Sequence, residues 1–196
     1  MAGSFRHANL FQADPHPGNY RFGPDGRVGL VDFGCVKILS ERQRHKFVAM
    51  ARAAVEGHKH ELRDLMVQTG FLASDSTLTA EEAYEWWAGI LYELFAPQPF
   101  TYTQDASRRA IRGMVDVRAA DHPVRRLSMP EDFAFFPRLS FGMSTLFAAL
   151  HATLDARSIY DDLHGIAEPV TPLGKQHHAW VRRRGLPLGL DAHDHP

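Results

Sequence analysis

The sequence has a single cysteine, Cys35, among 196 residues, so an internal disulfide is excluded. A lone thiol suits a reducing compartment, and we expect a cytoplasmic protein. The chain also lacks any run of about 18 apolar residues, and its first residues lack the apolar stretch of a secretion signal. We therefore expect no transmembrane segment and no export. The net charge of −1 predicts no general attraction to nucleic acid or to an anionic membrane.

What the chain does contain is the composition of an ordinary folded domain. Hydrophobic residues make up 44% and charged residues 23% of the sequence, which is typical of soluble globular proteins. The 12 histidines are spread along the chain, which argues against one histidine-rich metal cluster. A chain of this length is long enough to bury a hydrophobic core as one domain.

A β-hairpin is predicted near the amino terminus. Residues 20–22 and 27–31 are expected to be short strands, because the segment Gly23-Pro24-Asp25-Gly26 between them is a strong turn signal. Such a hairpin would fold Asp32 back beside Asn19. The sequence thus predicts that two oxygen-bearing side chains lie at the same end of the hairpin.

After Lys37 the apolar residues recur at helical spacing, which predicts a helical bundle over residues 40–168. The expected helices are 41–56, one ending near Gly70, one opened by Thr79 and Glu82, a weaker one over 104–117, a long one opened by Ser128 and Glu131, and one over 156–167. Pro137 is expected to kink or split the long helix. Residues 170–196, rich in His and Arg, are expected to be an irregular tail.

The segment over residues 11–37 carries the chemistry. Asp14 is followed by four residues and then Asn19, which is the spacing of a kinase catalytic loop. Thirteen residues later comes Asp32-Phe33-Gly34, a tripeptide whose aspartate holds magnesium in kinases. Each feature alone has an ordinary explanation as a turn residue or a chance match. Together, in this order and with a hairpin between them, they predict phosphoryl transfer with Asp14 as the catalytic residue and Asn19 and Asp32 as ligands of Mg²⁺.

These residues also carry a family resemblance. The run ADPHPGNYRFGPDGRVGLVDFGCVK resembles the central signature of the AarF/UbiB family of atypical kinases, and the segment from Met129, with Arg138, resembles a later helix of that family. The similarity extends over roughly residues 5–168. It implies a mainly α fold with one small β-hairpin, namely the helical carboxy-terminal lobe of a protein-kinase-like fold over residues 1–169, with Mg²⁺ and ATP as cofactors.

The resemblance also implies parts that do not fit before Asp14. Family members have an amino-terminal lobe with a nucleotide-binding lysine and its glutamate partner, so we expect this chain to lack that lobe and to show little or no turnover alone. A separate polypeptide bearing that lobe is therefore an expected partner, beside ATP. A coding sequence that continues upstream of Met1 is the alternative source of the lobe. A lipid or quinone-precursor link, and a place peripheral to a membrane, are implied by the family alone.

Several alternatives stay open from the residues. The chain could be a truncated or degenerate binding module without activity, or a small-molecule kinase of the aminoglycoside or choline type, which shares the pattern Asp14-x-His16-x-x-Asn19. His16 and Lys37 are candidate contacts of the nucleotide phosphates; a loop-fixing histidine and an exposed lysine are the plainer interpretations.

Overall fold

The computed structural model describes residues 9–115 and 122–189, and within them helices dominate. The helices are α2 (Glu41–Glu56), α3 (Lys59–Thr69), α4 (Ala80–Ile90), α5 (Tyr92–Phe95), α6 (Gln104–Val115), α7 (Phe135–Ala149), α8 (Ala156–Leu163) and α9 (Pro172–Arg184). Short 3₁₀ turns cover Pro17–Asn19, Pro123–Arg126 and Glu131–Phe133. The strands form three two-stranded sheets. The expected mainly α fold with a small hairpin is confirmed.

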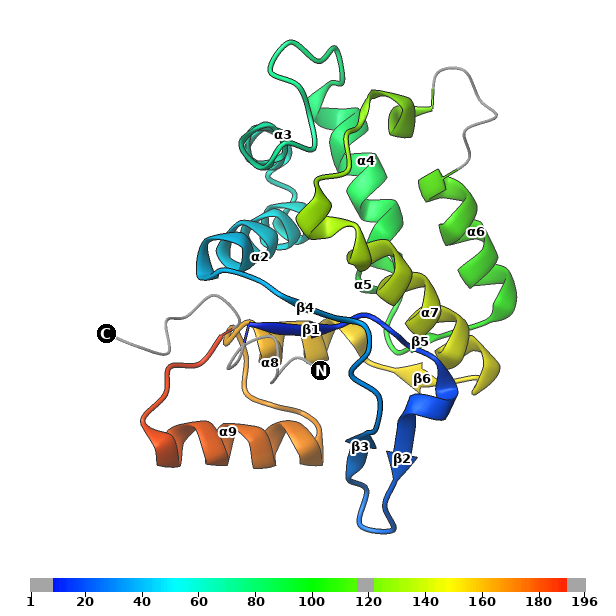
Figure 1. The fold of residues 1–196 in the computed structure, drawn as a ribbon, viewed down its shortest axis with the longest axis vertical. Coiled ribbons are helices and arrows are strands. Elements are labelled where there is room, and N and C mark those ends of the chain that lie inside the picture. Colours follow the sequence, from blue (N-terminus) through cyan, green and yellow to red (C-terminus); the bar gives the residue numbers. More distant parts are fainter. Residues whose placement is uncertain (1–8, 116–121, 190–196) are drawn as a thin grey trace.

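The predicted hairpin is present. Strands β2 (Tyr20–Phe22) and β3 (Val28–Leu30) pair antiparallel, with Tyr20 opposite Leu30. Figure 1 shows this hairpin projecting from the end of the molecule opposite to α3 and α4. Two further pairs were not predicted, because strands of two or three residues show too little alternation to be recognised. They are β1 (Leu10–Gln12) with β4 (Val36–Ile38), and β5 (Phe100–Thr101) with β6 (Thr153–Leu154).

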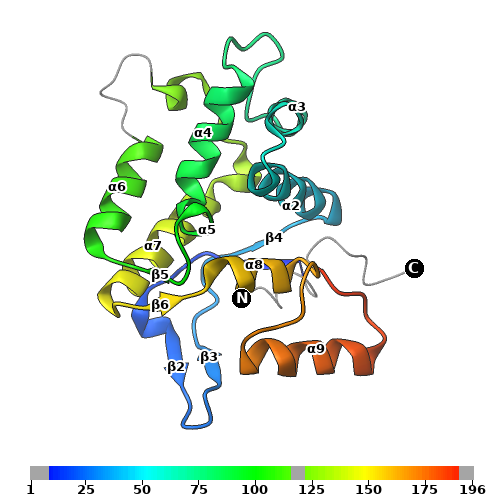
Figure 2. The same cartoon turned by 180° about the vertical axis from the view of Figure 1, so that it is seen from behind.

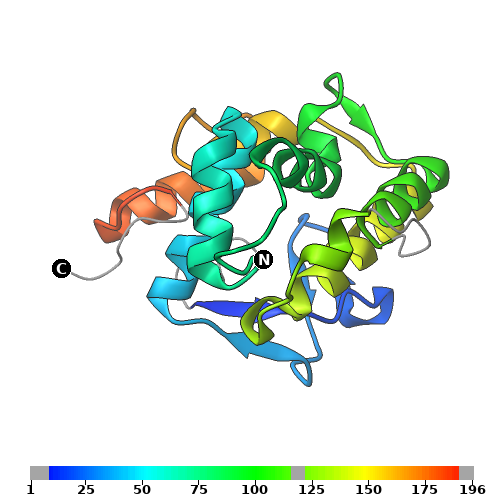
Figure 3. The same cartoon turned by 90° about the horizontal axis from the view of Figure 1, so that it is seen from above.

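Helices α2, α3 and α4 enclose the main core, and their ends lie where local sequence signals place them. The Ser40 side chain accepts from the backbone N–H of Gln43 at the start of α2, and Thr79 does the same for Glu82 at the start of α4. Figure 3 shows α4 between α3 on one side and α6 with α7 on the other. The buried core residues include Met50, Leu62, Met66, Leu78, Trp86 and Trp87.

Two expectations for the second half were wrong, one of them only in part. The side chain of Ser128 caps no helix; the residues after it form a short 3₁₀ turn whose cap position is Pro130. Helix α7 begins at Phe135 and continues through Pro137 to Ala149, so the proline does not split it, and the alternative of a kink stays a prediction. Pro137 is the third residue of the helix, in the first turn, where the backbone N–H groups have no intrahelical partner to lose.

The predicted irregular tail was also wrong over most of its described length, because residues Pro172–Arg184 form α9. The Thr171 side chain accepts from the N–H of Gly174 at its start, and Gly185 ends it with a left-handed backbone. His178 is buried on α9, and its Nε2 lies 2.6 Å from Oδ1 of Asp162 on α8. Figure 2 shows α9 beside α8, away from the α4–α6–α7 region. Residues 190–196 of the predicted tail lie outside the described residues.

None of the helices in the described ranges is long and apolar enough to cross a bilayer.

Candidate phosphoryl-transfer site

The loop between β1 and β2 is fixed by its own residues. Pro17 begins a 3₁₀ turn that ends at Asn19, and Nδ1 of His16 accepts the backbone N–H of Gly18 at 3.1 Å. The histidine thus caps this turn. Asn19, at the end of the turn, is only 8% exposed, whereas His16 is exposed. The structure therefore gives His16 a structural contact in the loop, and its predicted contact with nucleotide stays a prediction.

Asp14 and Asn19 are brought into direct contact. Nδ2 of Asn19 donates to Oδ2 of Asp14 at 2.8 Å and to the Asp14 carbonyl at 3.3 Å. From the opposite side Nη2 of Arg138, on α7, donates to Oδ1 of Asp14 at 3.0 Å. The hydrogen bonds from Arg138 and then from Asn19 hold the pKa of Asp14 below its usual range, because both stabilise the carboxylate. Asp14 is therefore ionised at neutral pH and already engaged on both oxygens.

Asp32 is placed next to this pair through the backbone. The N–H of Val31 donates to the carbonyl of Asn19 at 3.1 Å, which continues the hairpin pairing by one step and leaves Asp32 at its open end. The carboxylate of Asp32 is exposed, and its Oδ1 accepts from the N–H of Gly34 at 2.7 Å. The predicted juxtaposition of residues 19 and 32 thus holds for the backbone.

Gln12 links the two acidic segments, a contact that was not predicted. It is 2% exposed, and its Nε2 donates to the Asp14 carbonyl at 3.0 Å and to the Asp32 carbonyl at 3.4 Å. One amide therefore spans both acidic positions. A glutamine within a three-residue strand carries no sequence signal of such a bridge, because the second carbonyl lies 20 residues away.

Helix α7 packs directly against the loop between β1 and β2. A Cβ added at Gly142 would overlap the ring of Pro15, so the helix approaches the loop closely only because residue 142 has no side chain. One residue later, the Tyr20 hydroxyl lies 3.5 Å from Sδ of Met143. The position of Arg138 thus follows from the packing of α7 against residues 15–20.

Lys37 lies in the β1–β4 pair and not in the loop that carries Asp14 and Asn19. It is opposite Phe11 in the β1–β4 pair, whereas Gln12 is opposite Val36. Directly opposed residues share one face of a sheet and successive residues alternate, so Lys37 is on the other face from Gln12. The side chain of Lys37 is therefore on the face of the β1–β4 pair away from the Gln12 amide, which bridges Asp14 and Asp32.

Asn19 and Asp32 offer oxygen donors of the kind that Mg²⁺ prefers. Since Nδ2 of Asn19 donates to Asp14, its Oδ1 is the atom left for a cation, and Asp32 adds an exposed carboxylate. Mg²⁺ commonly takes one or two protein oxygens and completes its shell with phosphate and water. In the described residues no group of three or more His, Cys, Asp or Glu side chains is arranged to hold a metal ion.

Comparisons with known proteins agree with the motif. Residues 2–66 match the sequence model of the ABC1 atypical kinase-like domain. Over 129 residues the chain is 31% identical to the chloroplastic protein ACTIVITY OF BC1 COMPLEX KINASE 1 of Arabidopsis thaliana, covering 66% of this chain and 18% of that protein. It is 24% identical over 181 residues to the mitochondrial atypical kinase COQ8B of Rattus norvegicus, covering 91% of this chain and 31% of that protein.

The fold has a solved counterpart. The structure of the Rv3197–erythromycin complex from Mycobacterium tuberculosis superposes with a TM-score of 0.62 over 85% of this chain and 41% of that chain, at 24% identity. This likeness supports the kinase-like fold. The chain spans less than a third of the two curated relatives described above.

Proposed function

Because this chain is a relative of the AarF/UbiB family of atypical kinases, we propose that it forms the helical lobe of an atypical kinase or ATPase that binds Mg-ATP. The observation that carries the proposal is the arrangement around Asp14. Its carboxylate contacts Asn19, and Gln12 ties its backbone to that of Asp32. Asn19 and Asp32 would hold Mg²⁺, which neutralises charge on the phosphates during transfer.

Asp14 is better suited to orient an acceptor than to take its proton. A general base works best with a pKa near the working pH, whereas the hydrogen bonds from Arg138 and Asn19 lower the pKa of Asp14. We infer that this carboxylate accepts a hydrogen bond from the acceptor hydroxyl or from water and aligns it with the phosphate. The phosphate acceptor itself is not identified by these residues.

A second polypeptide segment is expected to cover the site. Large apolar side chains are exposed on the hairpin and just after it, which is unusual so close together on a water-facing surface. They are Phe22, Val28, Val31, Phe33 and Ile38, each more than half exposed. We propose that a small lobe bearing the nucleotide-binding lysine packs here, and that turnover requires it. The cytoplasmic location and any membrane or quinone-precursor link stay predictions.

The test is binding of Mg-ATP measured by calorimetry, with and without a polypeptide that carries the small lobe. We expect Asp32→Asn to weaken Mg-ATP binding at least about tenfold, a loss of roughly 1.4 kcal/mol. The matched control Asp64→Asn, at an exposed position on α3, should leave it unchanged. Equal binding by the wild type and by Asp32→Asn would show that the metal assignment is wrong.

The contact between Arg138 and Asp14 also fits a second candidate function, a nucleotide-binding module without turnover. Asp14 already has partners on both oxygens, Arg138 and Asn19. Hydrolysis of ATP in the presence of the small lobe, lost in Asp14→Asn, supports the enzyme. Tight binding of Mg-ATP with no hydrolysis under the same conditions supports the module.

A further inference from the structure

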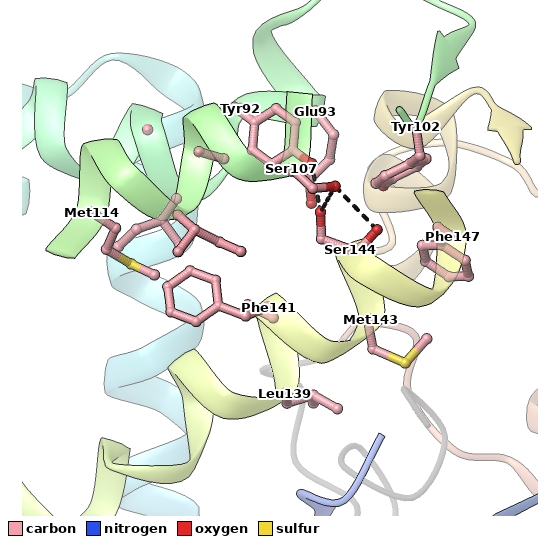
Figure 4. A pocket seen from close by; sticks show the side chains of 15 residues that line it. Tyr92, Glu93, Tyr102, Ser107, Met114, Leu139, Phe141, Met143, Ser144 and Phe147 are labelled. Carbon is pink, nitrogen blue, oxygen red and sulfur yellow. Dashed lines mark hydrogen bonds between the residues drawn. The ribbon is translucent and has the colours of Figure 1, made fainter. Parts of the chain in front are cut away.

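A cavity of about 190 Å³ lies among α4, α5, α6 and α7, apart from the site around Asp14. Figure 4 shows its lining, with Met114, Leu139 and Phe141 toward one side and the hydroxyl groups of Tyr92, Ser107 and Ser144 gathered at another. An apolar cavity of about 150 Å³ is large enough to hold benzene. The cavity is therefore the size of a single ring with a short substituent.

The hydroxyl groups form a connected cluster. The Tyr92 hydroxyl lies 2.7 Å from Oγ of Ser144, which lies 2.8 Å from Oγ of Ser107. The Ser107 hydroxyl also lies 3.2 Å from the Ser144 carbonyl. These oxygens are held in place by one another, and each hydroxyl oxygen has lone pairs that can accept a further hydrogen bond from a ligand.

Among the described residues that line the cavity, Glu93 is the one that carries a charge. Burial raises the pKa of Glu93 to about 7, because the carboxylate has lost water. No Lys, Arg or His is among the described residues that line the cavity, so a compensating cation would have to come from elsewhere. The cavity thus offers an acidic group without a cationic partner in the described lining, together with fixed acceptors and an apolar body.

We propose that this cavity binds a small organic amine, with the ammonium group beside the Glu93 carboxylate and the Ser107–Ser144 hydroxyls, and with a compact aromatic or branched alkyl body at the apolar side. An ammonium group has three donors and no acceptor, which matches one carboxylate and several hydroxyl oxygens. Anions are disfavoured by Glu93. A hard metal ion prefers several charged oxygen ligands, whereas Glu93 is the one carboxylate among the described residues of the lining.

The test uses the whole chain and a matched pair of probes, benzylamine and benzyl alcohol, which differ in one polar group. Binding is followed by protein NMR at about pH 8, where Glu93 is mostly ionised. We expect NMR signals from residues on α6 and α7 to shift as benzylamine is added, until the shifts reach saturation. Benzylamine should bind at least about tenfold more tightly than benzyl alcohol. Equal affinities for the two probes would overturn the proposal, and this comparison needs no variant.

Two variants test whether the probes bind in this cavity, and a third is a control. Glu93→Gln should weaken the binding of benzylamine at least about tenfold, whereas the affinity for benzyl alcohol should change by less than about twofold. Ala110→Leu, which fills the cavity, should abolish binding of both probes. Glu85→Gln, an exposed glutamate on α4, should change neither. Unchanged benzylamine binding in either of the first two variants, with a folded protein by circular dichroism, would rule the cavity out.

Discussion

Arg138 and Asp14 are 124 residues apart in the sequence, and Nη2 of the arginine lies 3.0 Å from Oδ1 of the aspartate. The contact joins the middle of the helical region to the loop that carries the kinase motif. Helix α7 is the connecting element, because it presents Arg138 to Asp14, Gly142 to Pro15 and Ser144 to the cavity. The loop and the cavity therefore share one wall.

Replacing the arginine should change the acid-base behaviour of the loop. Arg138→Met removes the largest contribution that lowers the pKa of Asp14, so that pKa should rise toward its usual range. The measurement is a carboxyl-carbon NMR titration of Asp14. Arg109→Met, at an exposed position on α6, is the control and should leave the titration unchanged. An Asp14 titration that does not move in Arg138→Met would show that the ion pair is absent in solution.

The close approach at Gly142 should be sensitive to a single methyl group. Gly142→Ala would place a Cβ against the Pro15 ring and force the loop and α7 apart. Overpacking of this kind costs about 1–3 kcal/mol in the free energy of unfolding, measured by urea denaturation. The control is Gly113→Ala on α6, where an added Cβ meets nothing within 4 Å, and it should stabilise by about 0.5–1 kcal/mol. If both substitutions stabilise the protein, α7 does not pack against the loop as closely as the structure shows.

The buried pair His178–Asp162 should hold α9 against α8. His178→Leu leaves the Asp162 carboxylate buried without this partner, which costs about 1–3 kcal/mol in the free energy of unfolding. The double variant with Asp162→Leu should lose less than the sum of the single changes, because residues in contact are coupled. Gln176→Ala, an exposed position on α9, should be neutral. Strict additivity of the two losses would argue against the pair.

The ion pair between Glu82 and Arg126 should make stability depend on pH. Hydrogen bonds from Arg126 and from the Thr79 cap lower the pKa of Glu82 from 4.5 to about 2. A lowered carboxyl pKa stabilises the folded state above the unfolded pKa of about 4.5, and this gain is lost as the pH falls toward 2. The stability difference between the wild type and Glu82→Gln should therefore be largest above pH 5 and shrink steadily below it. Denaturation across that range measures it, and a difference independent of pH would contradict the pair.

Short-range patterns were enough for much of the fold. The turn residues Gly23-Pro24-Asp25-Gly26 predicted the hairpin, and the caps Ser40 and Thr79 predicted two helix starts, because each acts within a few residues. Expectations failed where a local signal competed with packing. Ser128 resembled a cap but its segment forms a 3₁₀ turn, and the tail after Pro169 forms α9 with His178 and Val181 buried.

The sequence by itself determined which side chains are candidates for phosphoryl transfer, since the spacing of Asp14, Asn19 and Asp32 is a property of the chain. Only the tertiary structure decided what surrounds these residues. The Gln12 bridge, the approach of Gly142 and the Arg138 contact join residues 20 to 127 positions apart. Periodicity and turn preferences report only on near neighbours, so contacts of that range arise when the helices pack.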